Sequence, residues 1–166
     1  CVQLPGSDTS NRVGHLEAGN YFHSDETPAN DELINTGKAK MGDKLVTNDP
    51  MEAHYIGFNM WVEAVTKAGT TDVDKVRENM YGLTFPNLTG GIAEMLPNHH
   101  LSKPVLIGEI KADGQFDIIS KTAEVPGDAW TDFLPESKVL VSDWKNLKCG
   151  MYNQTTASCV QLKSIY

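Results

Sequence analysis

The sequence lacks long hydrophobic runs and long basic runs, and it holds only three cysteines among 166 residues. No apolar stretch approaches the roughly 20 residues of a membrane-spanning helix, so none is expected. The 14 lysines and arginines are outnumbered by 22 acidic residues, and the net charge is -8. Nucleic acid and anionic membranes both need a basic surface, so we expect neither as a partner.

What remains is the composition of an ordinary globular protein, with 40% hydrophobic and 22% charged residues. This length suits one domain, and we expect residues 1–166 to form a single compact unit. The chain as given shows no signal-peptide pattern and starts at Cys1, which we interpret as the interior of a segment rather than a lipid-anchored cysteine.

The cysteine count is odd. Cys149 and Cys159 are separated by a short polar loop, and a disulfide between them would add roughly 3 kcal/mol of stability on the chain-entropy model. Such a bond persists in an oxidising compartment. Two reduced surface thiols are the alternative.

Three stretches carry helix start and stop signals: 28–41, 49–68 and 71–82. The first begins at Thr27-Pro28, a capping threonine followed by proline. The second has the form of a capping box between Asp49 and Glu52.

The 49–68 stretch is apolar on two adjacent faces. One face holds Ile56, Met60 and Ala64, and the other holds Phe58, Trp61 and Val65. A helix with so much apolar circumference must be covered on most sides, so we expect it to be the core helix.

The remaining pattern predicts strands and turns. Residues 104–120 predict a hairpin, because Asp113-Gly114 separates two β-branched runs. Other segments are assigned as follows: 11–22 a helix or strand–helix junction, 45–47 and 139–141 short strands, 85–91 a turn-rich connector, and 128–134 a turn of helix. The mixture is that of an α/β protein.

Six ordered blocks also resemble one known family. They resemble the substrate-binding protein of urea and short-chain amide ABC transporters, in its C-terminal portion. The blocks are GHLEAGNYF (14–22), TPAND (27–31), NDPMEAHYIGFNMWVEAVTKAGTTDVD (48–74), PNLTGG (86–91), LPNHHLSKPVLIGEIKADGQF (96–116) and GDAWTDFLPES (127–137).

The resemblance implies a type I periplasmic binding protein: two α/β lobes joined by three crossover strands, with the solute between them. It implies a non-enzymatic protein of the periplasm that delivers urea or a related neutral amide to a membrane permease, without a cofactor. Because only the last part of the family is matched, we expect the N-terminal part of the fold to be missing and binding to be impaired.

The chain departs from the family at two glycines. Gly19 and Gly37 stand where family members carry tryptophan. Loss of a buried aromatic ring opens a cavity, at about 3–5 kcal/mol, unless another side chain fills it.

A partial fold also leaves apolar surface uncovered, above all around the 49–68 helix. Large exposed apolar patches usually find a partner. We therefore expect a homodimer or higher oligomer.

The resemblance suggests four ligand-binding residues: Asn20, Tyr21, Glu52 and Tyr55. Tyr21 would offer its hydroxyl or ring to an amide; alternatively it is a core tyrosine satisfied locally. Glu52 would accept from urea N–H groups; alternatively it completes the capping box.

The sequence gives little support for a metal site or for an enzyme active site. His99-His100, with His54 and Glu109, lack the spacing of a metal site, so no metal is expected. There is no GxSxG elbow and no phosphate-binding loop. Two functions remain: a solute-binding fragment with impaired binding, or a free-standing oligomeric interaction module without a small-molecule ligand.

Overall fold

A computed structural model describes residues 9–128, 135, 139–141, 151–153 and 155–160. Contacts group the chain into two units, Cys1–Gly127 and Asp128–Tyr166. The expectation of one compact unit over residues 1–166 stays a prediction for the whole chain. Within the described ranges, no helix is both long and apolar enough to cross a membrane.

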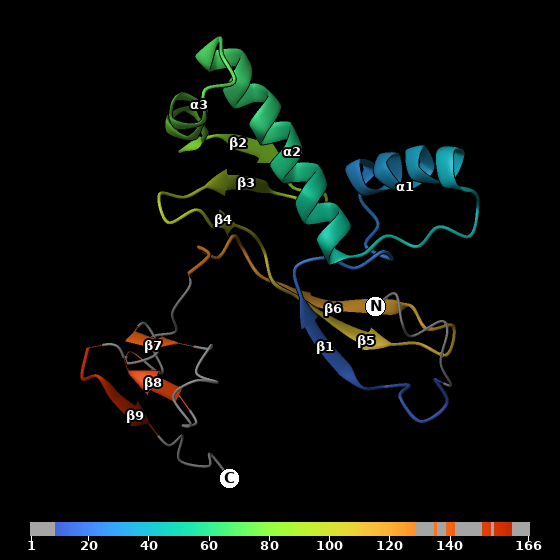
Figure 1. The fold of residues 1–166 in the computed structure, drawn as a ribbon. Coiled ribbons are helices and arrows are strands. Elements are labelled where there is room, and N and C mark those ends of the chain that lie inside the picture. The colour runs from blue at the N-terminus through green and yellow to red at the C-terminus, as the bar shows by residue number, and fades with distance from the viewer. Residues whose placement is uncertain (1–8, 129–134, 136–138, 142–150, 154, 161–166) are drawn as a thin grey trace. The chain divides into compact units, whose positions relative to one another are not determined.

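The first sheet of the first unit is antiparallel, in the order β1-β5-β6 (Figure 1). Its strands are β1 (Leu16–Gly19), β5 (Leu106–Ile110) and β6 (Phe116–Lys121). The predicted hairpin is confirmed: β5 pairs with β6, and Gly114 closes the turn at a φ of 77°. Phe22, Leu106, Ile110 and Phe116 form the apolar core of this sheet.

The second sheet has the order β2-β3-β4 and is also antiparallel. Its strands are β2 (Thr84–Pro86), β3 (Ile92–Met95) and β4 (Leu101–Ser102). The connector expected over 85–91 is therefore wrong in part, because Phe85 and Pro86 pair as part of β2, whereas 87–91 form the turn. Pro86 cannot donate to a ladder, which β2 tolerates because it lies at the edge of the sheet.

Three helices complete the first unit: α1 (Pro28–Met41), α2 (Asp49–Ala68) and α3 (Val73–Met80). The predicted start of α1 is confirmed, since Thr27 Oγ1 accepts from Asn30 N at 3.1 Å. The segment 11–22 forms β1 and no helix, whereas 45–47 is extended without pairing as a strand.

The start of α2 differs from the predicted capping box. Asn48 is the N-cap, and its Oδ1 accepts from Met51 N at 2.9 Å. Glu52 is therefore one residue too far along the helix to complete a box with the cap, and its carboxylate pairs elsewhere. At the other end Gly69 closes the helix at a φ of 63°, as predicted.

The two apolar faces of α2 have different environments. Ile56, Met60 and Ala64 are buried in a core shared with α3 and the second sheet. Phe58 and Trp61 remain exposed, at 63% and 42%. The expectation that α2 is covered on most sides is wrong for this chain, because a single face is buried.

The second unit contains three short antiparallel strands, in the order β7-β8-β9. They are β7 (Leu140–Val141), β8 (Met151–Asn153) and β9 (Ser158–Val160). β7 confirms the strand predicted over 139–141. The helical turn expected over 128–134 lies almost wholly outside the described residues.

Candidate functional site

A buried hydrogen-bond network surrounds Tyr21, in the segment after β1. The Tyr21 hydroxyl donates to Asn30 Oδ1 at 2.6 Å and shares a hydrogen bond with Thr47 Oγ1 at 2.6 Å. Asn30 Nδ2 in turn donates to the backbone carbonyl of Asp25 at 2.7 Å. Burial raises the pKa of Tyr21 to about 12, so the phenol keeps its proton at neutral pH.

His23 joins the same network from the other side of Thr47. Its Nδ1 accepts from Thr47 N at 3.2 Å and lies 2.7 Å from Thr47 Oγ1. An accepting Nδ1 places the ring in its neutral form. Burial lowers the pKa of His23, and the positive charge of Lys38 lowers it further.

Glu52 forms a buried ion pair with Lys103. Glu52 is fully buried on α2, and its Oε2 pairs with Nζ of Lys103, which follows β4. Burial raises the pKa of Glu52, outweighing the opposite effect of Lys103. Next to this pair, Asn20 Nδ2 donates to the carbonyl of Pro104 at 3.0 Å.

Lys121 makes a third connection, at the end of β6. Its Nζ lies 2.9 Å from Asp25 Oδ2 and donates to the carbonyl of Thr89 at 2.6 Å. Thr27 Oγ1 also donates to the carbonyl of Leu88. The loop between β2 and β3 is thereby held against the start of α1.

We call these neighbouring side chains the polar junction. Its members come from β6, α1 and α2, from the loops beside β1 and β4, and from the loop before α2: Asn20, Tyr21, His23, Asp25, Asn30, Thr47, Glu52, Lys103 and Lys121. Two chain segments run between the two sheets here, 103–105 and 122–125, and a third segment, 43–48, connects α1 to α2. The first two run side by side, since Lys103 and Val125 pair through their backbones.

Some buried atoms next to the junction lack a partner among the described residues. They are Glu52 Oε1, Thr89 Oγ1 and both amide atoms of Asn87. Buried polar atoms usually bind protein, water or ligand, and an unmade bond costs about 1–3 kcal/mol.

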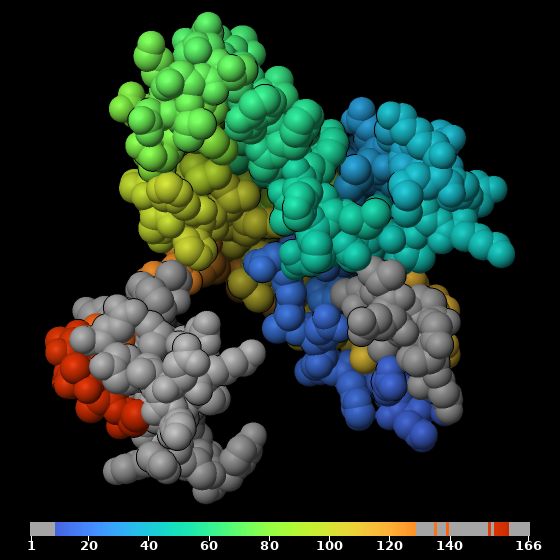
Figure 2. Space-filling view, viewed as in Figure 1, coloured from blue at the N-terminus to red at the C-terminus, as the bar shows by residue number. Residues whose placement is uncertain are grey.

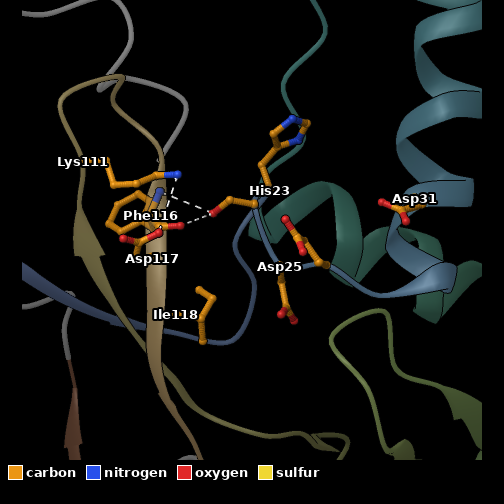
Figure 3. A pocket seen from close by; sticks show the side chains of 9 residues that line it. His23, Asp25, Asp31, Lys111, Phe116, Asp117 and Ile118 are labelled. Carbon is orange, nitrogen blue, oxygen red and sulfur yellow. Dashed lines mark hydrogen bonds and ion pairs between the residues drawn. The ribbon is translucent and has the colours of Figure 1, made fainter.

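An open pocket of about 530 Å³ lies beside the junction (Figure 3). His23 and Asp25 line it from the segment between β1 and α1, and Asp31 from the first turn of α1. Lys111 and Asp117 line it from the β5–β6 hairpin. Ser24 donates to the carbonyl of Phe116 at 2.7 Å, which links the segment before α1 to β6 within the pocket lining. The remaining lining residues are Glu26 and Ile118. With four carboxylates and one lysine, the pocket mainly accepts hydrogen bonds.

The structure brings three of the four predicted site residues together. Asn20, Tyr21 and Glu52 all lie at the polar junction, each with a partner within the chain. Tyr55 lies outside it: it is 38% exposed, and its ring meets Phe85 edge-on at 6.1 Å between centroids. Contact of any of the four with a solute stays a prediction.

The sequence reasoning missed six junction residues: His23, Asp25, Asn30, Thr47, Lys103 and Lys121. Asn30 and Thr47 are hydroxyl or amide residues beside helix starts, where capping is the ordinary reading. Lys103 was visible as the lysine in the HHLSKP block, but nothing local pairs it with Glu52.

The histidines do not gather around a metal. His99 Nε2 bonds the Tyr81 hydroxyl at 2.8 Å, whereas His54 Nδ1 lies 2.6 Å from the carbonyl of Pro50. Across the described residues, no three His, Cys, Asp or Glu side chains could hold a metal ion.

The disulfide prediction stays open. Cys159 is exposed on β9. Cys149 lies outside the described residues.

The space next to the two unusual glycines is occupied. A Cβ on Gly19 would lie 3.5 Å from the ring of Phe22, and one on Gly37 would collide with Leu45. Leu45 therefore takes the space that a larger residue at position 37 would need, and Phe22 lies in ordinary van der Waals contact with position 19.

The architecture matches solved binding proteins. An amino acid ABC transporter substrate-binding protein from Pseudomonas fluorescens Pf-5 superposes with a TM-score of 0.64 and 25% identity, over 75% of this chain and 35% of that chain. A solute binding protein of an ABC transporter from Rhodopseudomonas palustris BisB5, in complex with 3,4-dihydroxy benzoic acid, superposes with a TM-score of 0.66 and 19% identity, over 75% of this chain and 34% of that chain. This mixed α/β structure is thus a partial type I periplasmic binding protein fold, as expected, and these neighbours are not enzymes.

Residues 2–136 match the family described as periplasmic binding protein domain, and the chain belongs to that family. A protein named limonene hydroxylase from Geobacillus stearothermophilus is 37% identical over 107 residues, which are 64% of this chain and 20% of that protein. The chain thus spans about a third of the length of the solved relatives and a fifth of this one.

Proposed function

We propose that the chain is part of a periplasmic solute-binding protein that captures a small neutral amide, such as urea or acetamide, for a membrane permease. The binding surface is the acidic pocket, and Asn20, Tyr21 and Glu52 lie at the junction that shares His23 and Asp25 with it. The class follows the family and the transport proteins that share the fold. The choice of an amide is our own inference.

The choice of an amide rests on the hydrogen-bond acceptors that line the pocket. Asp25, Glu26, Asp31 and Asp117 present acceptors, and an amide presents N–H donors. A ligand carboxylate, as in the dihydroxybenzoic acid complex, would meet like charge here. A volume of about 530 Å³ lies in the range of small-molecule sites.

Binding is expected to be weak, because the pocket is open. The Asp117 side chain is 71% exposed, so water competes for its oxygens. The second candidate, an oligomeric module without solute, is favoured by the exposed apolar side of α2.

Thermal unfolding with increasing acetamide tests the proposal, with 4-hydroxybenzoate and methylammonium as comparison ligands. We expect a saturable rise of Tm with acetamide and none with the anion. The double variant Asp31→Asn/Asp117→Asn should abolish the rise, and Asp113→Asn, an exposed carboxylate outside the pocket, should keep it. A response to the anion, to methylammonium alone or to no ligand would contradict an amide site.

A further inference from the structure

The four carboxylates in the described pocket lining differ in burial. The Asp25 side chain is only 9% exposed. The other three are exposed: Glu26, Asp31 and Asp117. Asp31 lies in the first turn of α1, which forms part of the surface of the first unit (Figure 2). Water screens interactions at exposed charges and does so much less at a buried one. The groups around Asp25 therefore decide which ligand charge this end of the pocket accepts.

Lys121 holds the Asp25 carboxylate in place. It is not among the residues that line the pocket, yet its Nζ lies 2.9 Å from Asp25 Oδ2 and 3.3 Å from Asp25 Oδ1. The same Nζ donates to the carbonyl of Thr89, a fully buried residue, at 2.6 Å. Moving Lys121 away from Asp25 would also take a hydrogen bond from this carbonyl, which is unfavourable. The positive charge is therefore fixed beside the buried carboxylate.

Lys111, the lysine that lines the pocket, is held differently. Its Nζ lies 3.8 Å from Asp113 Oδ2 and 3.7 Å from Asp117 Oδ1. The two lysine side chains are similarly exposed, at 39% for Lys111 and 34% for Lys121, but their partners are not. Asp113 and Asp117 are 61% and 71% exposed, so both ion pairs of Lys111 are long and solvated. Such pairs contribute little, and Lys111 can move aside when a ligand enters.

The fixed charges at the buried end of the pocket cancel. His23 adds none at about pH 8, because burial and, to a smaller extent, the charge of Lys38 lower its pKa. Asp25 contributes one negative charge and Lys121 one positive charge. A neutral N–H donor can therefore bind Asp25 without charge repulsion. A cationic donor at the same place is repelled by the positive charge of Lys121.

We propose that Lys121 is a positioning residue that makes the pocket prefer neutral N–H donors over cationic ones. It acts through Asp25, whose carboxylate it orients and whose charge it balances. Without Lys121 the buried carboxylate would lack a counter-charge, and a cationic ligand would supply one. This inference rests on the proposed function, because it concerns the selectivity of the same pocket.

Acetamide and the acetamidinium cation test this selectivity. They share one planar shape and differ in charge, with the oxygen of the amide replaced by nitrogen. Titration calorimetry at about pH 8, with sodium chloride balancing the acetamidinium salt, gives the Kd of each ligand. For the parent chain we expect acetamide to bind more tightly. For Lys121→Met we expect the ratio of the two Kd values to shift towards acetamidinium by about tenfold or more.

Two other lysine variants serve as comparisons. Lys111→Met removes the loosely paired lysine of the pocket and should shift the ratio by less than about threefold. Lys67→Met removes an exposed lysine in the last turn of α2, paired with Glu63, and should leave the ratio unchanged. Circular dichroism shows whether each variant folds. If Lys121→Met does not fold, Lys121→Gln replaces it. Its amide can donate to the carbonyl of Thr89 and carries no charge, so the same shift is expected.

The change in preference separates the proposed role from a purely structural one. A loss of structure weakens the binding of both ligands alike and keeps the ratio of Kd values. A parent chain that binds neither ligand, with a Lys121→Met variant that binds acetamidinium, would contradict the amide function but support the role of Lys121. Equal shifts for Lys121→Met and Lys111→Met, or an unchanged ratio in both Lys121 variants, would overturn the proposal.

Discussion

The polar junction and the acidic pocket share His23 and Asp25, but they differ in how far their charged side chains are exposed to solvent. In the junction Glu52 is fully buried against Lys103. In the pocket the Asp117 side chain is 71% exposed, and its ion pair with Lys111 is long, at 3.7 Å.

The comparison separates framework from binding surface. Groups buried with fixed partners hold the chain segments that pass between the sheets. Removing one of them leaves its partner buried without a counter-charge or hydrogen bond. Groups exposed in the pocket already bind water, and a solute can replace that water at little cost. The predictions below test this division.

The largest expected effect is at Glu52. Glu52→Ala should lower the free energy of unfolding by about 3–5 kcal/mol, because it leaves Lys103 without its buried counter-charge. Guanidinium chloride unfolding measures this. Asp117→Ala is the matched pocket variant and should change stability by less than about 0.5 kcal/mol.

Replacing both partners sharpens that test. Glu52→Leu/Lys103→Met removes both charges and should recover most of the lost stability. If Glu52→Ala costs no more than Asp117→Ala, the junction is not the framework described above.

An intermediate effect is expected at Tyr21. Tyr21→Phe removes the hydroxyl that bonds both Asn30 and Thr47, at about 1–3 kcal/mol. Tyr55→Phe removes a hydroxyl from a partly exposed ring and should have little effect. Thermal and denaturant unfolding of the pair measure the difference, and equal losses would contradict a buried network around Tyr21.

Local signals in the sequence predicted much of this fold. The start of α1 at Thr27, the end of α2 at Gly69 and the hairpin around Gly114 each depend on a few neighbouring residues. The hairpin of β2 and β3 was missed because Pro86 and the following glycines are equally typical of a loop.

Contacts between distant residues could not be predicted in this way. Glu52 suggested a local capping box, whereas its partner Lys103 lies 51 positions away. Leu45 fills the space next to Gly37 for the same reason: the contact depends on how the chain returns after α1. The junction is made mostly of such pairs, so the sequence pointed to three of its residues without showing what they do.

The smallest effect is expected from pH, at the residue that the two regions share. The pKa of His23 is lowered in the native state, so the unfolded chain binds the proton more tightly. Native stability from this group is therefore complete above its ordinary pKa of 6.5 and falls as the pH drops through that value towards the native pKa. His23→Asn keeps an acceptor for Thr47 N and cannot titrate, so its stability should fall less over the same range. Because Glu52 has a raised pKa and acts in the opposite direction, the two proteins are compared at each pH, where its contribution cancels. Parallel stability curves for the two proteins would place His23 with the solvated pocket rather than with the buried junction.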